Sequence, residues 1–234
     1  MIIEICANGF ESARIAQNAG ADRIELCTDL SVGGLTPSHG LIEKVIEKLS
    51  IPVHVLIRPR SGDFVYSKKE LDTMLSDIAF CKELGCSGIV SGVLTSENTI
   101  DEKATRQLIE ASNGMEFTFH RAFDCDVDIV SSIKLLIDLG VTRLLSSGQQ
   151  IKAIDGIELL NKMKLLSKDQ LQIMPGSGIN AENAPDFKRA GFKAIHFSAT
   201  KKANLSKKAS GLFANEVIGT SDRLEIERII KTLA

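Results

Sequence analysis

The sequence predicts an α/β protein with a single domain, a closed (β/α)8 barrel of the TIM type. Three observations predict this fold. Eight short apolar runs alternate with longer amphipathic stretches, no proline- or serine-rich linker divides the chain, and 234 residues suit a small barrel. A weak repeat supports units of one kind, because Ile3-Glu4-Ile5-Cys6 returns as Ile24-Glu25-Leu26-Cys27. An open doubly wound sheet is the less favoured alternative.

Each predicted strand is a short apolar run bounded by Gly, Pro, Asn or Ser, as expected for parallel strands buried on both faces. The eight runs are Ile2–Cys6, Arg23–Cys27, Val53–Ile57, Gly88–Ser91, Glu116–Phe119, Arg143–Ser146, Gln172–Met174 and Ala194–Ser198.

The stretches between the strands have the spacing of amphipathic helices. We expect Asn8 to cap the first, and Thr36 to cap the second with Pro37 at its first position. Several of these stretches end at a glycine, which closes a helix with a positive φ. The predicted helices are Phe10–Ala19, Pro37–Leu49, Lys68–Leu84, Asp101–Ser112, Asp126–Leu139, Lys152–Leu166, Glu182–Ala190 and Asp222–Leu233.

The last β/α unit is the irregular part of the predicted barrel. Residues 199–221 are rich in Lys, Ala, Ser and Gly and separate the last strand from a C-terminal helix over 222–233. A connection of about twenty residues is long for a compact domain. We therefore expect this segment to be mobile or functional.

Composition narrows the class of protein. Lys and Arg number 28 against 30 Asp and Glu, a net charge of −2, which argues against nucleic-acid binding by a broad basic surface. No apolar run approaches the length of a membrane span, and the first residues have no signal-peptide pattern. The odd number of cysteines, five, predicts free thiols and a reducing cytoplasm. Formation of a homo-oligomer is compatible with this composition.

Polar side chains fall on one face of five predicted strands, and that face points into a barrel. At the catalytic mouth, we expect His120 to act as a general acid or base near neutral pH. Glu4 or Glu25 would be a second proton-transfer group. The alternative is a buried structural network of Glu and Arg inside the barrel. His39 and His54 are interpreted as structural.

Three loops at the same mouth predict a site for an anionic ligand. Arg58 and Arg60 follow the third strand, and paired guanidinium groups suit carboxylate or phosphate. Ser147 and Gly148 follow the sixth strand. The turn after the seventh strand contains Gly176, Ser177 and Gly178, and its backbone N–H groups would assist in holding the anion.

Cys6 and Cys27 end adjacent predicted strands on the inward face. Neighbouring strands lie about 4.8 Å apart, so the two thiols could bind one soft metal ion together. Two thiolates alone fit low-coordinate Cu(I) better than zinc, which takes four ligands or three and water. The alternative, favoured by the residues alone, is a pair of small buried hydrophobic side chains.

Several ordered motifs resemble the CutC copper-homeostasis family. The resemblance covers at least residues 2–198. Its motifs are Glu4-Ile5-Cys6, Gly20-Ala21-Asp22-Arg23-Ile24-Glu25-Leu26-Cys27, Gly33-Gly34-Leu35-Thr36-Pro37-Ser38, Ile57-Arg58-Pro59-Arg60-Ser61-Gly62-Asp63-Phe64, Thr118-Phe119-His120-Arg121-Ala122-Phe123-Asp124, Ser147-Gly148 and Met174-Pro175-Gly176-Ser177-Gly178-Ile179.

The resemblance implies a (β/α)8-type barrel, a cytoplasmic location and an association with copper tolerance. The Cu(I) thiolates proposed for the family would fall on Cys6 and Cys27. The chain departs from the family's common glycine triplet at Ser177, and its tail beyond Ser198 matches less well.

Three functions follow from the sequence. The first is a Cu(I)-binding protein of copper homeostasis that uses Cys6 and Cys27. The second is a barrel enzyme acting by acid/base chemistry on a small anionic or phosphorylated metabolite, with Arg58 and Arg60 as its anion anchors. The third is a ligand sensor without catalysis. No organic cofactor is implied, and neither nucleic acid nor a membrane is an expected partner.

Overall fold

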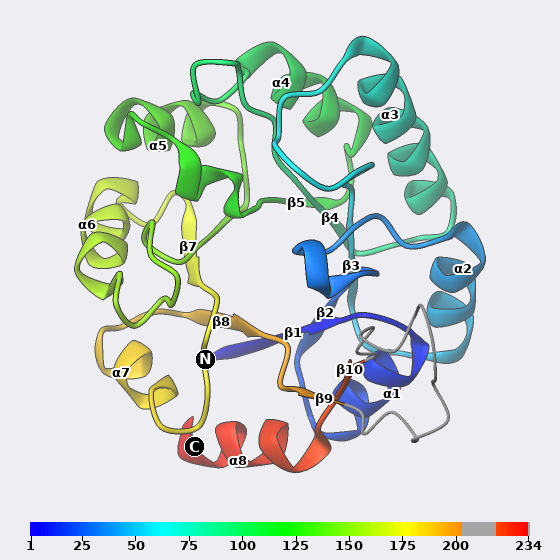
Figure 1. The fold of residues 1–234 in the computed structure, drawn as a ribbon, viewed down its shortest axis with the longest axis vertical. Helices are drawn as coiled ribbons and strands as arrows, with labels where there is room; N and C mark the ends of the chain where they lie inside the picture. Colours follow the sequence, from blue (N-terminus) through cyan, green and yellow to red (C-terminus); the bar gives the residue numbers. More distant parts are fainter. Residues whose placement is uncertain (203–218, 234) are drawn as a thin grey trace, which may run out of the picture.

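The computed structural model describes residues 1–202 and 219–233. Figure 1 shows a ring of parallel strands surrounded by helices. The eight barrel strands are β1 (Ile2–Ala7), β2 (Arg23–Leu26), β3 (Val53–Leu56), β4 (Gly88–Ser91), β5 (Glu116–Phe119), β6 (Arg143–Ser146), β7 (Gln172–Pro175) and β8 (Ala194–Phe197). The predicted fold class is confirmed, and each strand lies within one residue of its predicted bounds.

The strands pair in the sequence order of a (β/α)8 barrel. The sheet runs from β7 through β6, β5, β4, β3, β2 and β1 to β8, and all of its pairs are parallel. A parallel bridge between Gly176 and His196 brings β7 and β8 together and nearly closes the ring. A Cβ atom on Gly176 would lie 2.5 Å from Leu145 Cδ1 and 3.3 Å from His196 Cβ, so a side chain here would force these neighbours to move.

The main core lies between the strands and the surrounding helices. Outward-facing aliphatic residues such as Ile5, Ile24 and Val55 are fully buried there. The α-helices are α1 (Phe10–Asn18), α2 (His39–Lys48), α3 (Lys68–Glu83), α4 (Glu102–Ala111), α5 (Ile129–Asp138), α6 (Ile157–Ser167), α7 (Ala184–Arg189) and α8 (Arg223–Leu233). No helix within the described ranges is long and apolar enough to cross a membrane.

Several helix caps and helix beginnings differ from the prediction. Ser38, and not Thr36, caps α2 by accepting a hydrogen bond from the Leu41 N–H, while Thr36 Oγ1 accepts one from the Arg58 N–H. The N-cap of α1 is Gly9, without a side-chain cap. Helices α5, α6 and α7 also begin later than predicted.

Asp126 does not begin α5. A short 3-10 helix, η2 (Arg121–Cys125), follows β5, and Asp128 caps α5. A second 3-10 helix, η1 (Leu30–Val32), follows β2.

The connection predicted over 199–221 contains regular structure at both ends. Strands β9 (Thr200–Lys202) and β10 (Gly219–Ser221) pair antiparallel, and β10 lies beside α1 (Figure 1). The Asn8 side chain donates to the Gly219 carbonyl, and the Ser221 N–H donates to Ser12 Oγ. The rest of that predicted connection, 203–218, lies outside the described residues.

Candidate functional site

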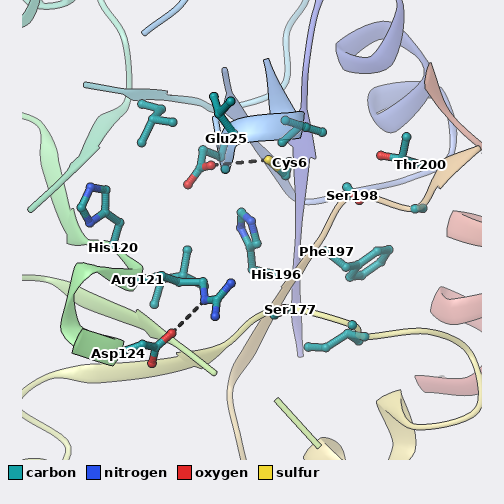
Figure 2. Close-up of a pocket in the computed structure, with 18 of the residues that line it drawn as sticks. Cys6, Glu25, His120, Arg121, Asp124, Ser177, His196, Phe197, Ser198 and Thr200 are labelled. Atoms are coloured by element: carbon teal, nitrogen blue, oxygen red, sulfur yellow. Dashed lines mark hydrogen bonds and ion pairs between the residues drawn. The ribbon is translucent and has the colours of Figure 1, made fainter. Parts of the chain in front are cut away.

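A cavity of about 860 Å³ opens at the carboxyl ends of the barrel strands, where the sequence places the catalytic mouth. Its lining includes side chains from β1, β2 and β8 and from the loops after β3, β5 and β7 (Figure 2). Two groups of polar residues lie at it. We call Cys6, Glu25 and His196, together with the buried neighbour Cys27, the thiol–acid side, and Arg58, His120, Arg121 and Asp124 the cation side.

Strand register explains how the thiol–acid side assembles. Cys6 on β1 lies opposite Glu25 on β2. The Cys6 thiol lies 3.5 Å from Glu25 Oε1, to which it donates, and 3.6 Å from the Cys27 sulfur. Cys27 is fully buried and lies behind Cys6, covered by the chain at Gly34, where a Cβ would be 3.5 Å from Cys27 Cβ. Two sulfurs, an imidazole and a carboxylate therefore meet at the inner wall of the cavity.

Glu4 lies beneath this group and holds it in place. It pairs with Arg23 on β2 and His196 on β8, each opposite it in register. Its carboxylate accepts from Arg23 Nε and lies 2.7 Å from His196 Nδ1. Glu4 is fully buried and outside the cavity lining. For Glu4 and Arg23, the structure therefore shows the buried ion network that was the alternative interpretation.

Burial and neighbouring charges shift the pKa values on this side in different directions. Burial would raise the pKa of Glu4, but the His196 hydrogen bond and the charges of His196 and Arg23 hold it well below its usual range. Burial raises the pKa of Glu25. Burial would lower the pKa of His196, yet Glu25, Cys6 and Glu4 raise it well above its usual value. The same burial thus has opposite outcomes for the two carboxyl groups, because Glu4 has cationic partners in direct contact and Glu25 has none among the described residues.

The thiol–acid side also has the donors of a metal site. One ligand atom from each of Cys6, Glu25 and His196 lies within 4.8 Å of the others. The Cys27 contact raises the pKa of the Cys6 thiol, and burial raises it further. Because a thiolate is the metal-binding form, a metal ion would have to displace this proton.

The cation side contains a buried guanidinium group without a carboxylate partner. Arg58 Nη1 donates to the Val32 and Gly34 carbonyls, at 2.7 and 2.9 Å, and Nη2 donates to the Gly62 carbonyl. No ion pair to Arg58 exists within the described residues, and its Nε is buried without a hydrogen-bond partner. Arg58 therefore ties the loop after β2 to the loop after β3 and lies over the Phe64 ring, and it adds to the cavity wall a positive charge with no carboxylate partner in the described chain.

His120 is a neutral side chain at the end of β5. Burial and the charge of Arg58 lower the pKa of its imidazole to about 3. Its Nδ1 accepts from the Ala122 N–H at 3.2 Å, which leaves the proton on Nε2, and Nε2 has no partner in the described chain. The Phe64 ring contacts the His120 ring, with centroids 4.9 Å apart. At neutral pH this ring is a hydrogen-bond donor and not an imidazolium acid.

The loop after β6 already binds an anion, the side chain of Asp124. The Ser147 N–H, the Gln149 N–H and Ser146 Oγ all donate to this carboxylate, at 2.6–3.3 Å. The Gly148 N–H donates to Ser146 Oγ and supports the same turn. Ser147 and Gly148, predicted to bind an external anion, therefore serve an internal one.

Arg121 is the exposed cation of this side. Its Nε donates to Asp124 Oδ2 at 2.8 Å and its Nη2 donates to Ser147 Oγ at 2.9 Å. The side chain is 43% exposed, and it lines the cavity. His196 and Ser177 line the same cavity (Figure 2). Asp124 thus orients Arg121 while leaving Nη1 without a partner in the described chain.

The structure brings together most of the predicted site residues, but not all of them. Cys6, Glu25, Arg58, His120, Ser177 and Gly178 line one cavity. Arg60 does not: its guanidinium binds Glu70 and Asp63 and several loop carbonyls, outside the cavity lining. Gly176 pairs with His196 in the bridge that closes the barrel, and it is not part of the cavity lining.

Sequence reasoning assigned no role to His196 or Arg121. Alternation along β8 places His196 on the inward face, but its position opposite Glu4 depends on the register between β1 and β8. The motif His120-Arg121-Ala122-Phe123-Asp124 contained the signal for Arg121, since an Arg and an Asp three residues apart can pair across one helical turn.

Comparison with known proteins gives the family. A family model described as the CutC family matches residues 1–201. The chain belongs to the CutC family. A CutC family protein from Pasteurella multocida is 47% identical over 199 residues, covering 85% of this chain and 82% of the relative. One from Histophilus somni is 41% identical and covers 99% of this chain and 98% of the relative.

Solved structures agree with this family and with the fold. The crystal structure of a CutC protein from Streptococcus agalactiae, with copper homeostasis as its suggested role, is 36% identical with a TM-score of 0.80. It covers 85% of this chain and 98% of that one. N-(5'-phosphoribosyl)anthranilate isomerase from Pyrococcus furiosus has a TM-score of 0.57 and 14% identity, which shows a common fold alone.

Proposed function

We propose that this CutC-family chain binds Cu(I) through the thiolates of Cys6 and Cys27, in the reducing cytoplasm. The observation that carries the proposal is the 3.6 Å separation of the two sulfurs at the inner wall of the cavity. Two thiolates form a soft donor set of the kind that selects Cu(I), and the His196 ring would join them after losing the proton that its raised pKa favours. His196 is the third donor within reach.

Further observations support the proposal. All five cysteines are free thiols, as a reducing compartment requires. Cys6 lines the cavity, so an ion has a path to the sulfurs from the mouth. The copper role suggested for the relative from Streptococcus agalactiae is consistent with this chemistry.

A titration of reduced, metal-depleted protein with Cu(I), against a chromogenic Cu(I) chelator, tests the proposal. We expect one equivalent bound by the wild type and none by Cys6→Ser/Cys27→Ser. The matched control is Cys81→Ser/Cys86→Ser, which removes two buried free thiols that lie outside the cavity. Equal uptake by the two double variants would refute the site, and stronger retention of zinc than Cu(I) would refute the metal.

A second function is supported by the size of the cavity. At about 860 Å³ it is much larger than one metal ion requires and lies in the range of small-molecule sites. We propose an enzyme that acts by acid/base chemistry on a small anionic or phosphorylated metabolite. Glu25 would transfer the proton, because its Oε2 is buried without a partner in the described chain. His120 would donate a hydrogen bond, and Glu4 would hold His196.

Proton exchange at carbon offers a test of this second function without a known substrate. Pools of small organic acids and phosphoesters are incubated in D₂O with the protein and followed by proton NMR. We expect deuterium to enter at a carbon of one compound with wild type and at least a hundredfold more slowly with Glu25→Gln. Equal rates with wild type and Glu25→Gln, or incorporation into no compound, would refute it.

A further inference from the structure

The cavity has one wall with excess positive charge. Arg58 is buried there without an acidic partner in the described chain, and Arg121 shares the carboxylate of Asp124 with four other polar groups from β6 and the loop after it. Buried charges in proteins are normally paired. The acids of the opposite wall are already engaged, Glu4 by Arg23 and His196 and Glu25 by the Cys6 thiol. Among the described residues no carboxylate pairs with Arg58, so the cation side favours a negatively charged occupant of the cavity.

Arg121 is the residue of this wall best placed to contact such a charge. Asp124 and Ser147 fix two of its nitrogen atoms, so the guanidinium is held in one orientation. Its remaining nitrogen, Nη1, has no partner in the part of the chain that the structure describes, and the side chain lines the cavity. A fixed planar guanidinium group is a strong binder of oxyanions because little freedom is lost on binding.

The turn after β7 offers further donors. Ser177 and Gly178 both line the cavity, and their N–H groups make no hydrogen bond to any described residue. Both have a positive φ, 92° for Ser177 and 67° for Gly178. Ser177 is a residue for which this conformation is strained, and its Oγ stabilises it by donating to the Ile151 carbonyl at 2.7 Å.

We infer that the cavity binds the oxyanion of a small organic ligand between the Arg121 guanidinium and the N–H groups of Ser177 and Gly178. The buried charge of Arg58 and the neutral N–H donor of His120 favour the same occupant. The inference deepens the second proposed function, on which it rests, by naming the residues that hold the anion. It also moves the anchor from Arg58 and Arg60 to Arg121. The ligand chemistry is a phosphate or carboxylate group at one end of the molecule.

Amide NMR of ¹⁵N-labelled, metal-free protein tests this site directly. Inorganic phosphate and acetate are titrated separately, and the resonances of Ser177 and Gly178 are followed. We expect them to shift with at least one of the two ions, and the ion bound more tightly identifies the phosphate or carboxylate source. Arg121→Gln should weaken that binding at least tenfold. Arg106→Gln, which removes the same charge from an exposed ion pair on α4, should change it less than twofold.

Three outcomes would overturn the inference. The Ser177 and Gly178 resonances could stay unmoved with both ions, or Arg121→Gln could bind as tightly as Arg106→Gln. If thermal unfolding shows that Arg121→Gln is not folded, Arg121→Lys replaces it, which keeps the charge but loses the planar group. An Arg121→Lys affinity equal to that of wild type would also overturn it.

Failure here is distinguishable from failure of the other proposals. Cys6→Ser/Cys27→Ser should bind the oxyanion like wild type, and Arg121→Gln should take up Cu(I) like wild type. Loss of oxyanion binding in the cysteine variant would contradict a separate anion site on Arg121. Absence of proton exchange with every metabolite would refute the catalytic proposal while the NMR titration still measured anion binding.

Discussion

The two walls of the cavity differ in how far the chain itself satisfies their charges. On the thiol–acid side, Glu4 is enclosed by Arg23 and His196, and Glu25 accepts from the Cys6 thiol. On the cation side, Arg58 is buried against carbonyl groups without a counter-ion in the described chain. The ion network beneath the first wall is therefore satisfied within the chain, whereas the positive charge of the second has no carboxylate partner among the described residues.

The largest expected effect comes from breaking the enclosed pair on the thiol–acid side. Glu4→Gln leaves Arg23 and His196 buried without their carboxylate, so we expect a loss of about 3–5 kcal/mol in the free energy of unfolding. Urea denaturation measures it. Glu11→Gln, in the exposed pair with Arg14, should leave the denaturation midpoint nearly unchanged. Similar midpoints for the two variants would mean that this wall does not depend on its ion network.

A smaller effect should follow from a change where the two walls meet. Gly176→Ala places a Cβ 2.5 Å from Leu145 Cδ1 and 3.3 Å from the His196 side chain. Overpacking of this kind costs about 1–3 kcal/mol of stability, to be measured by urea denaturation. Gly40→Ala, in α2 with nothing within 4 Å of the new atom, should not destabilise the protein. A stable Gly176→Ala protein would show that the contact between β7 and β8 tolerates a side chain.

The pH dependence of stability should report the neutral His120 of the cation side. Its pKa of about 3 in the folded chain lies below the ordinary value of 6.5, so the unfolded chain binds the proton more readily. Stability is therefore lost as pH falls below 6.5. Between pH 6.5 and 5 we expect wild type to lose about 1–2 kcal/mol more than His120→Gln, measured by denaturation at each pH. Parallel curves would mean that His120 keeps its ordinary pKa when folded.

The smallest expected effect is on anion affinity, from a change at Arg60, the second arginine of the loop after β3. Arg60 binds Glu70 and Asp63 outside the cavity, so Arg60→Met should change the phosphate or acetate affinity less than twofold. The NMR titration described for Arg121 measures it. A loss as large as that of Arg121→Gln would restore Arg60 to the anion site that the sequence predicted.

The barrel could be predicted because its signals are local. Eight apolar runs and the glycines that end several helices mark the elements without knowledge of any tertiary contact, and all eight strands were placed within one residue. Helix beginnings were less predictable at Thr36 and Asp126. Several hydroxyl and carboxylate groups lie within reach of the same helix end, and tertiary contacts decide which one caps it.

Strand alternation predicts which side chains of the site point into the barrel, but not how they pair with one another. Alternation placed Cys6, Glu25 and His120 at the mouth, where they lie. It could not show that Glu4 is enclosed by Arg23 and His196, because that depends on the register of the closing strand. Nor could it show that the Arg58 donors would be taken by carbonyls, which depends on how two loops fold together.

The closure of the barrel links the occupancy of the mouth to local unfolding. Neighbouring strands elsewhere in the sheet are paired over two to four positions, whereas the bridge between Gly176 and His196 is the one recorded between β7 and β8 in the described chain. We expect local opening to begin at this line, where the described strands have the shortest pairing. Since His196 also faces the cavity, an occupant that contacts it stabilises the closed ring by mass action. The backbone amides of β7 and β8 are then the natural reporters of whether the mouth is filled, through their rate of exchange with solvent deuterium.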